Sequence, residues 1–197
     1  PSDSVLCITG TPYDTLRGVV WGEGNGSLKD YKISFETVAL TQEGKVDEEA
    51  VRAALSQKTY QMVYIQRSRG YELRDAFTVE EIGNMYSFVR AAGFEGVIFV
   101  DNCYGEFVET REPTEVGADV IVGSLIKNPG GGLAPTGGYI AGKEACISRI
   151  ENRLTAPSVG GEVGSYAYGY QYYYQGLFLA PHTVAQALKG GLLIGAC

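Results

Sequence analysis

Short apolar, β-branched runs alternate along the chain with segments whose apolar residues recur at helical spacing. The apolar runs predict six strands, at residues 5–9, 33–40, 62–66, 96–101, 119–125 and 138–141. Several of them are apolar at every position, which is typical of strands covered on both faces. Strands that alternate with helices form parallel sheets with right-handed crossovers. The pattern therefore predicts an α/β fold with a parallel sheet between layers of helices.

Two connecting helices carry clear start signals. Asp47 stands where a helix N-cap is expected, and Thr78 is followed three residues later by Glu81, the pattern of a capping box. Gly93 is a natural end for the second of these helices. Because the strands are parallel, their carboxyl ends meet at one edge of the sheet, where ligands bind.

The last third of the chain has a different pattern. Pro181 followed by His182 predicts that a helix begins there. Four tyrosines precede it at helical spacing, which indicates packing or a subunit interface: Tyr166, Tyr170, Tyr173 and Tyr174. The chain begins without Met and stops inside an apolar helical pattern, so we expect it to be a fragment of a longer protein.

The composition is that of a globular protein, with 45% hydrophobic and 20% charged residues among 197. A formal net charge of −7 and scattered basic residues argue against a nucleic-acid partner. No apolar run approaches the ~20 residues that cross a bilayer, and no export signal precedes the first strand. We therefore expect a cytoplasmic protein that binds neither nucleic acid nor membrane.

No pattern of metal ligands is visible in the sequence. The four cysteines lie far apart without a Cys-x-x-Cys pair, and His182 is the one histidine. We expect no metal site, and reduced cysteines fit a cytoplasmic location.

Charged residues stand at the ends of two predicted strands. Asp101 ends one apolar run, and Ser124 and Lys127 end the next. If these strands are parallel neighbours, the carboxylate and the amine face one crevice. An Asp and a Lys so placed more often form an ordinary ion pair, so the interpretation depends on the residues around them.

The surrounding residues resemble those of the fold-type I pyridoxal-phosphate enzymes, and among them the cystathionine and methionine lyase group. Residues 101–104, Asp-Asn-Cys-Tyr, resemble the group's Asp-Asn-Thr-Tyr, and residues 124–127, Ser-Leu-Ile-Lys, resemble its Ser-x-Thr-Lys. Residues 64–71 and 123–132 are similar to those of the methionine γ-lyase-like or aluminium-resistance subgroup. The resemblance covers nearly the whole chain, in order.

This resemblance implies a role for four residues. Lys127 would form an imine with the cofactor aldehyde and later carry a proton at the substrate α-carbon. Asp101 would lie against the pyridine nitrogen and keep it protonated. Ser124 would donate a hydrogen bond to the phosphate, and Tyr13 would stack on the ring, although a turn serine and an exposed turn tyrosine are the ordinary alternatives.

The resemblance also implies an architecture, an incomplete large domain of the aspartate-aminotransferase type. This domain is a three-layer α/β sandwich with a mostly parallel sheet and helices on both faces. Residues 1–197 would be its central part, with an N-terminal segment that carries a Gly-rich phosphate loop and a C-terminal small domain both missing. Ile126 replaces the group's Thr, which removes one possible phosphate hydroxyl. Arg67, Arg69 and Arg153 are further candidates for anion contacts.

The predicted function is a carbon–sulfur lyase that uses pyridoxal 5'-phosphate to cleave a sulfur amino acid of the methionine or cystathionine type. Transamination or replacement on the same cofactor, or an inactive fragment, are the alternatives. A nucleotide-binding loop at residues 127–132 fails because a Walker loop places its glycines before the lysine. A small amino-acid substrate and a homodimer or homotetramer are expected from the resemblance.

Overall fold

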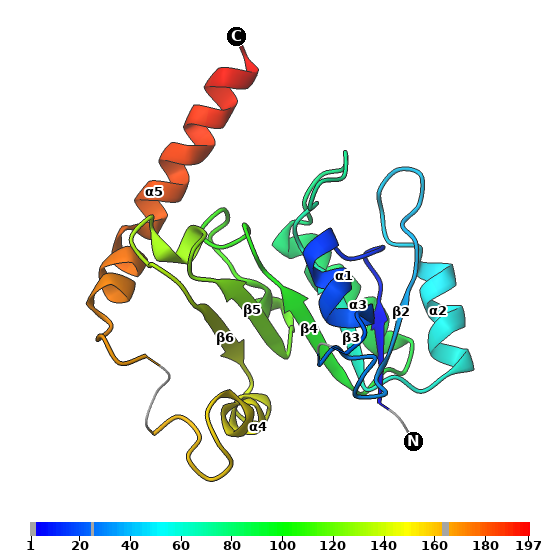
Figure 1. The fold of residues 1–197 in the computed structure, drawn as a ribbon. Helices are drawn as coiled ribbons and strands as arrows, with labels where there is room; N and C mark the ends of the chain where they lie inside the picture. The colour runs from blue at the N-terminus through cyan, green and yellow to red at the C-terminus, as the bar shows by residue number, and fades with distance from the viewer. Residues whose placement is uncertain (1–2, 25, 163–165) are drawn as a thin grey trace.

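A six-stranded sheet runs through the centre of the molecule in this computed structural model, which describes residues 3–24, 26–162 and 166–197 (Figure 1). The strands are β1 (Ser4–Cys7), β2 (Ser34–Thr37), β3 (Met62–Gln66), β4 (Val97–Asp101), β5 (Val120–Ser124) and β6 (Gly138–Gly142). The helices are α1 (Asp14–Trp21), α2 (Glu48–Gln57), α3 (Val79–Ala91), α4 (Glu144–Leu154) and α5 (Gln171–Gly195), with short 3-10 helices η1 (Pro113–Val116) and η2 (Asn128–Gly130).

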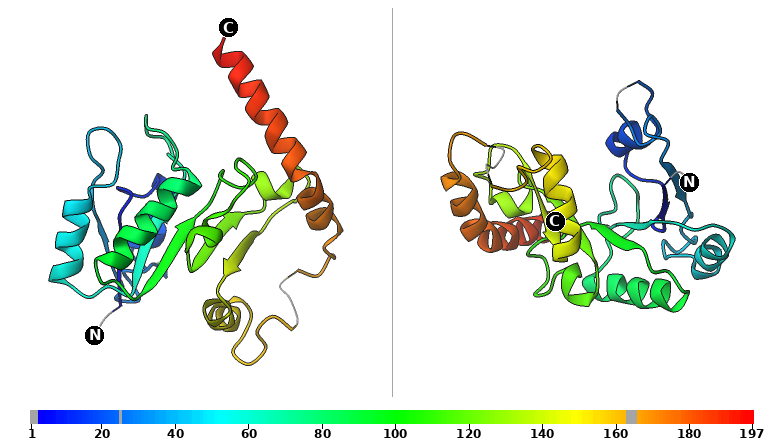
Figure 2. Two further views of the ribbon diagram at one scale, coloured as in Figure 1. Left: turned by 180° about the vertical axis from the view of Figure 1, so that it is seen from behind. Right: turned by 90° about the horizontal axis from the view of Figure 1, so that it is seen from below.

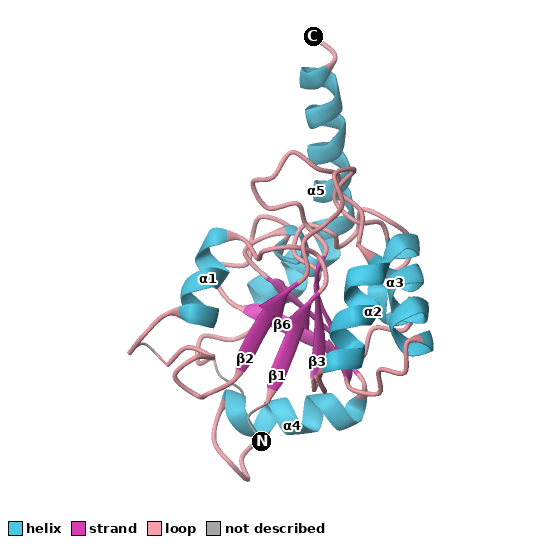
Figure 3. Ribbon diagram, turned by 90° about the vertical axis from the view of Figure 1, so that its right-hand side faces the viewer, coloured by secondary structure: helices cyan, strands magenta, loops and turns pink. Residues whose placement is uncertain are grey.

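The strand order is β2-β1-β3-β4-β5-β6, and the first five strands are parallel. Helix α1 lies on one face of the sheet and helices α2 and α3 lie on the other (Figure 3). The predicted fold class, a mostly parallel sheet between helical layers, is confirmed. The last strand differs from the simple alternating pattern, because β6 pairs with β5 in the antiparallel direction. The connection from β5 to β6 contains only η2 and loop, too little for the helical crossover that parallel neighbours need.

The predicted helix signals are present in the structure. The side chain of Asp47 accepts a hydrogen bond from the Ala50 amide at 2.9 Å, and Thr78 and Glu81 form a complete capping box. Helix α3 ends just before Gly93, whose φ of 86° is the left-handed conformation expected at a helix C-terminus. These caps satisfy backbone amides that would otherwise lack a partner.

The main core lies between the sheet and helices α2 and α3. It joins apolar side chains of β1, β3 and β4 to the inner face of α3, and its fully buried members include Leu6, Val63, Ile82, Val89 and Ile98. Each fully buried side chain of this size contributes about 1.5–3 kcal/mol. This core holds the parallel strands rigidly, and with them the edge where they end.

Helix α5 projects from the body of the molecule (Figures 1 and 2). The prediction that a helix begins near Pro181 is wrong, since α5 runs from Gln171 and contains Pro181 in its interior. By length and composition alone α5 could cross a membrane, so the expectation that no apolar segment is long enough is also wrong. One such helix is weak evidence for a membrane span, because a core helix buried inside a protein passes the same test.

Candidate active site

Two neighbouring strands, β4 and β5, end at the same edge of the sheet. Asp101 is the last residue of β4. Lys127 follows β5 after a short turn and is the residue immediately before η2. Both side chains line a cavity of about 500 Å³, whose wall also contains Tyr13 and Ser124. The fold thus brings together all four residues that the sequence predicted for the site.

Hydrogen bonds hold the Asp101 carboxylate from two sides. The side chain is 8% exposed, its Oδ2 accepts a hydrogen bond from the Tyr64 hydroxyl at 3.2 Å, and its Oδ1 accepts one from the Cys103 amide at 3.1 Å. Burial, and then the charge of Asp101, raise the pKa of the Tyr64 hydroxyl far above its ordinary value. Tyr64 therefore stays protonated and donates to the carboxylate at neutral pH.

The Lys127 amine lies against the ring of Tyr104, with Nζ 4.7 Å from the ring centroid. Burial by itself lowers the pKa of Lys127, whereas Cys103, Tyr104 and Asp101 raise it, and the net pKa is above its ordinary value. The amine is therefore a cation at neutral pH. Tyr104 has a φ of 68°, a conformation that costs about 1–3 kcal/mol in a residue with a side chain and that gathers at functional sites.

Cys103 interacts with both charged groups of the site. Burial, followed by the charge of Asp101, raises the pKa of its thiol to about 11. At neutral pH the thiol is therefore neutral, and a neutral thiol is a poor nucleophile. Its role here is to line the cavity beside Lys127.

Tyr13 and Ser124 complete the wall of the cavity from two different elements. Tyr13 immediately precedes α1, and its amide donates a hydrogen bond to Oε1 of Gln66 at 3.1 Å. Ser124 ends β5 and pairs with Gly138 of β6. In the described ranges of the chain the Ser124 hydroxyl has no hydrogen-bond partner, so it can donate to a ligand.

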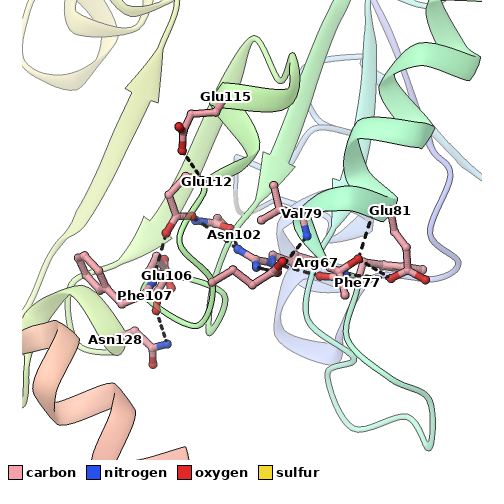
Figure 4. A network of polar contacts seen from close by, with 12 residues as sticks. Arg67, Phe77, Val79, Glu81, Asn102, Glu106, Phe107, Glu112, Glu115 and Asn128 are labelled. Atoms are coloured by element: carbon pink, nitrogen blue, oxygen red, sulfur yellow. Dashed lines mark hydrogen bonds and ion pairs between the residues drawn. The ribbon is translucent and has the colours of Figure 1, made fainter.

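A buried polar network lies behind the strand ends (Figure 4). The Arg67 guanidinium, 3% exposed, donates to Oδ1 of Asn102 at 2.8 Å and to Oε1 of Glu109 at 2.6 Å, and it lies 3.5 Å from Glu112. Arg67 was a candidate for anion binding, but each of its three guanidinium nitrogens already contacts a protein oxygen. Its function is structural: it holds Asn102, the residue after Asp101.

The network continues to the turn that carries Lys127. The Asn102 side chain donates to Glu112 and to the Tyr139 hydroxyl, which donates to Oε1 of Glu106 at 2.8 Å. The Asn128 side chain, next to Lys127, donates to the backbone oxygen of Glu106 at 3.0 Å (Figure 4). One connected set of hydrogen bonds therefore positions the residues adjacent to both Asp101 and Lys127.

Sequence reasoning missed Tyr64, Tyr104 and this network. A signal for Tyr64 existed, because a tyrosine inside a buried strand needs a partner for its hydroxyl. The ring of Tyr104 reaches Lys127 only through a left-handed backbone conformation, which a sequence does not show. Arg67 was a candidate for anion contacts in the sequence, and its burial could not be foreseen because its three carboxylate and amide partners come from the segment 102–112.

The groups around the cavity fit the cofactor that the resemblance implies. The Lys127 amine, the buried Asp101 carboxylate, the Tyr13 ring and the Ser124 hydroxyl line one cavity. In that order, these groups match the aldehyde, the ring nitrogen, the ring face and the phosphate of pyridoxal phosphate. Lys127, Asp101, Tyr13 and Ser124 are the residues that would hold it.

Comparisons with known proteins give one consistent result. The sequence model of the family described as methionine gamma-lyase matches residues 1–197. The chain is 53% identical over 195 residues to the uncharacterized protein YnbB of Bacillus subtilis. The matched region covers 98% of this chain and 46% of YnbB.

Solved structures agree. A Listeria monocytogenes protein, provisionally named a cystathionine beta-lyase involved in aluminum resistance, has a TM-score of 0.90 at 54% identity, over 96% of this chain and 48% of its own. The carbon-sulfur lyase involved in aluminum resistance from Clostridium novyi has a TM-score of 0.91 at 46% identity, over 98% and 46%.

More distant likeness extends to the pyridoxal-5'-phosphate-dependent protein YhfS of Escherichia coli, with a TM-score of 0.68 at 21% identity over 97% of this chain and 45% of YhfS. At this identity the likeness shows the fold alone. The chain spans about half the length of the relatives that it matches.

Proposed function

Because the chain belongs to the methionine gamma-lyase family, we propose that its complete protein is a pyridoxal-phosphate-dependent carbon–sulfur lyase acting on a sulfur amino acid. The observation that carries the proposal is the placement of Lys127 and Asp101 at adjacent strand ends on one cavity. The names of the Listeria and Clostridium relatives, which refer to cystathionine and carbon–sulfur bonds, support it.

When bound, pyridoxal phosphate supplies an electron sink for charge that develops at the substrate α-carbon. Lys127 would hold it covalently through Nζ and, once exchanged for the substrate amine, would move a proton to and from that carbon. Asp101 would keep the pyridine nitrogen protonated, since a buried anion favours the cation beside it. Tyr64 and the Cys103 amide orient the carboxylate for this task.

The remaining cavity residues would bind and orient. Tyr13 would cover the ring face, a contact that contributes about 0.5–1.5 kcal/mol beyond its buried area. Ser124 would donate its hydroxyl to the phosphate, because that hydroxyl is unpaired within the chain's described residues.

Incubation of the complete protein with cystathionine, methionine and cysteine tests the proposed reaction. Pyruvate from cystathionine or cysteine indicates cleavage at the β-carbon, and 2-oxobutyrate from cystathionine or methionine indicates cleavage at the γ-carbon. Release of neither keto acid from any of them contradicts the lyase proposal. Conversion of an added keto acid to an amino acid would indicate a transaminase instead.

A chemical label tests the role of Lys127. Borohydride reduction of the cofactor-loaded protein should fix pyridoxal on Lys127, because reduction makes a bond to a protein amine irreversible. The Lys127→Ala variant should lose the label, while Lys189→Ala on α5 should keep it. Peptide mapping that places pyridoxal on Lys143 or Lys189 would show that the assignment is wrong.

The organisation of the complete protein is also a proposal. The Gly-rich phosphate loop and the arginine for the substrate carboxylate are proposed to lie outside residues 1–197, in line with the chain's share of its relatives. A cytoplasmic homodimer or homotetramer remains a prediction, checked by sedimentation of the complete protein.

A further inference from the structure

A second cavity adjoins the candidate active site. It measures about 560 Å³ and shares Cys103 with the cavity of Lys127. Tyr104, whose ring lies 4.7 Å from the Lys127 Nζ, also lines it. Cys103 lines both cavities, and Tyr104 lies between the Lys127 amine and the second cavity, so the second cavity lies directly beside the candidate active site.

One wall of the second cavity is the loop between β3 and α3. The Arg74 guanidinium donates to the Ser68 oxygen at 2.8 Å and to the Asp75 oxygen at 2.9 Å. The Phe77 amide donates to the Arg67 oxygen at 3.0 Å, and the Gln66 side chain donates to the Ser68 oxygen at 3.1 Å. The loop is therefore held in place from both ends, and Arg69 lies between these contacts.

Three arginines line the cavity, but only one of them is available. Arg67 is paired with Glu109, and Arg74 bonds Glu72 as well as the loop backbone. Among residues that the structure describes, the Arg69 guanidinium makes no hydrogen bond or ion pair, and its side chain is exposed. The cavity thus presents one cation without a partner in the described part of the chain, together with the carboxylate of Asp75 and an apolar surface that includes Ala76, Phe77 and Val108.

We propose that this second cavity is a subsite for the part of the substrate beyond the sulfur, and that Arg69 binds a carboxylate there. The inference rests on the proposed lyase function and names its substrate class: a cysteine or homocysteine thioether whose second arm carries an acid, as cystathionine does. The apolar surface accommodates the methylene groups of that arm, and a guanidinium matches a carboxylate with two parallel hydrogen bonds.

Two nearly isosteric substrates test the subsite in the complete, cofactor-loaded protein. S-(2-carboxyethyl)cysteine carries the second carboxylate, and S-propylcysteine has a methyl group in its place. The wild type should prefer the acid, and Arg69→Gln should reduce that preference roughly tenfold, mainly through KM, because the contact is made in ground and transition states alike. Arg149→Gln, an exposed arginine of α4, is the matched control and should leave the preference unchanged.

Other outcomes overturn the proposal in distinguishable ways. An equal loss for both substrates would place Arg69 on the shared α-carboxylate, and a weakened cofactor affinity would place it on the cofactor phosphate. An unchanged preference would show that Arg69 is a solvated surface residue. Calorimetric binding of both compounds is measured alongside turnover. If neither compound is turned over, the lyase proposal fails, while the ratio of affinities still decides the subsite.

Discussion

At the residue scale, the charge of Asp101 is separable from its place in the fold. Asp101→Asn retains an oxygen for the Cys103 amide, so we predict that the protein stays folded. The neutral amide cannot keep a ring nitrogen protonated, and kcat should fall about 10²–10³-fold, the scale for one preorganised electrostatic contact. Steady-state kinetics measure kcat, and the visible absorbance of bound cofactor shows whether the variant still holds it. Asp14→Asn, at an exposed aspartate, is the control; unchanged activity in Asp101→Asn would remove this residue from the site.

Glu106 is a second residue with a testable charge state. It is 4% exposed, its Oε2 is buried without a partner among the described residues, and burial raises the pKa of its carboxyl above the ordinary value. The folded state therefore holds this proton more tightly than the unfolded chain, and it loses stability as pH rises from the ordinary pKa through the raised one.

Glu106→Gln cannot ionise, so we predict that it lacks this loss. The difference in free energy of unfolding, variant minus wild type, should increase between acid and neutral pH. Urea denaturation of both complete proteins at several pH values measures it. A difference that does not change with pH would mean that Glu106 ionises over the same pH range in the folded and the unfolded protein.

At the element scale, α5 packs directly on the turn that follows Lys127. A side chain at Gly176 would collide with the backbone oxygen of Gly130, and one at Gly131 would collide with that of Gly176. The glycines after Lys127 thus permit backbone contact between η2 and α5. We predict that Gly176→Ala lowers the free energy of unfolding by about 1–3 kcal/mol, the usual cost of overpacking, and weakens cofactor attachment at Lys127.

The same helix provides the control for this prediction. Gly190 has open space around its Cα, so Gly190→Ala should stabilise the protein by roughly 0.5–1 kcal/mol through helix propensity alone. Thermal denaturation compares the two variants. Equal effects of the two substitutions would contradict the direct contact between α5 and the Lys127 turn.

At the scale of the whole molecule, residues 1–197 expose a large apolar surface. Phe178 is 83% exposed, and Leu192, Leu193 and Ile194 on the same helix are 76%, 68% and 78% exposed. Surfaces of this kind normally contact other protein. We predict that residues 1–197 alone self-associate through this surface. They should bind pyridoxal phosphate at least about tenfold more weakly than the complete protein, because phosphate binding needs several donors. They should show no lyase activity, because the arginine for the substrate carboxylate is proposed to lie outside them.

Sedimentation, cofactor titration by visible absorbance and a keto-acid assay on both proteins check this prediction. A monomeric 1–197 chain that binds the cofactor as tightly as the complete protein and cleaves cystathionine would show that the essential site residues all lie within it.

The sequence by itself determined what depends on neighbours along the chain. The apolar runs predict the strands, Thr78 and Glu81 predict a cap, and the residues around Asp101 and Lys127 indicate the family and the pair at the strand ends. These signals are local, since a cap or a strand period is complete within a few residues.

Only the tertiary structure decided the features that join distant segments. The burial of Arg67 and the hydrogen bond from Tyr64 to Asp101 each depend on contacts between segments far apart along the chain. Helix α5 continues through Pro181 although proline removes one helical hydrogen bond, a local preference that the rest of the helix outweighs. The second cavity exists because the loop before α3 and the turn after β4 meet at one strand edge, and no local pattern records such a meeting.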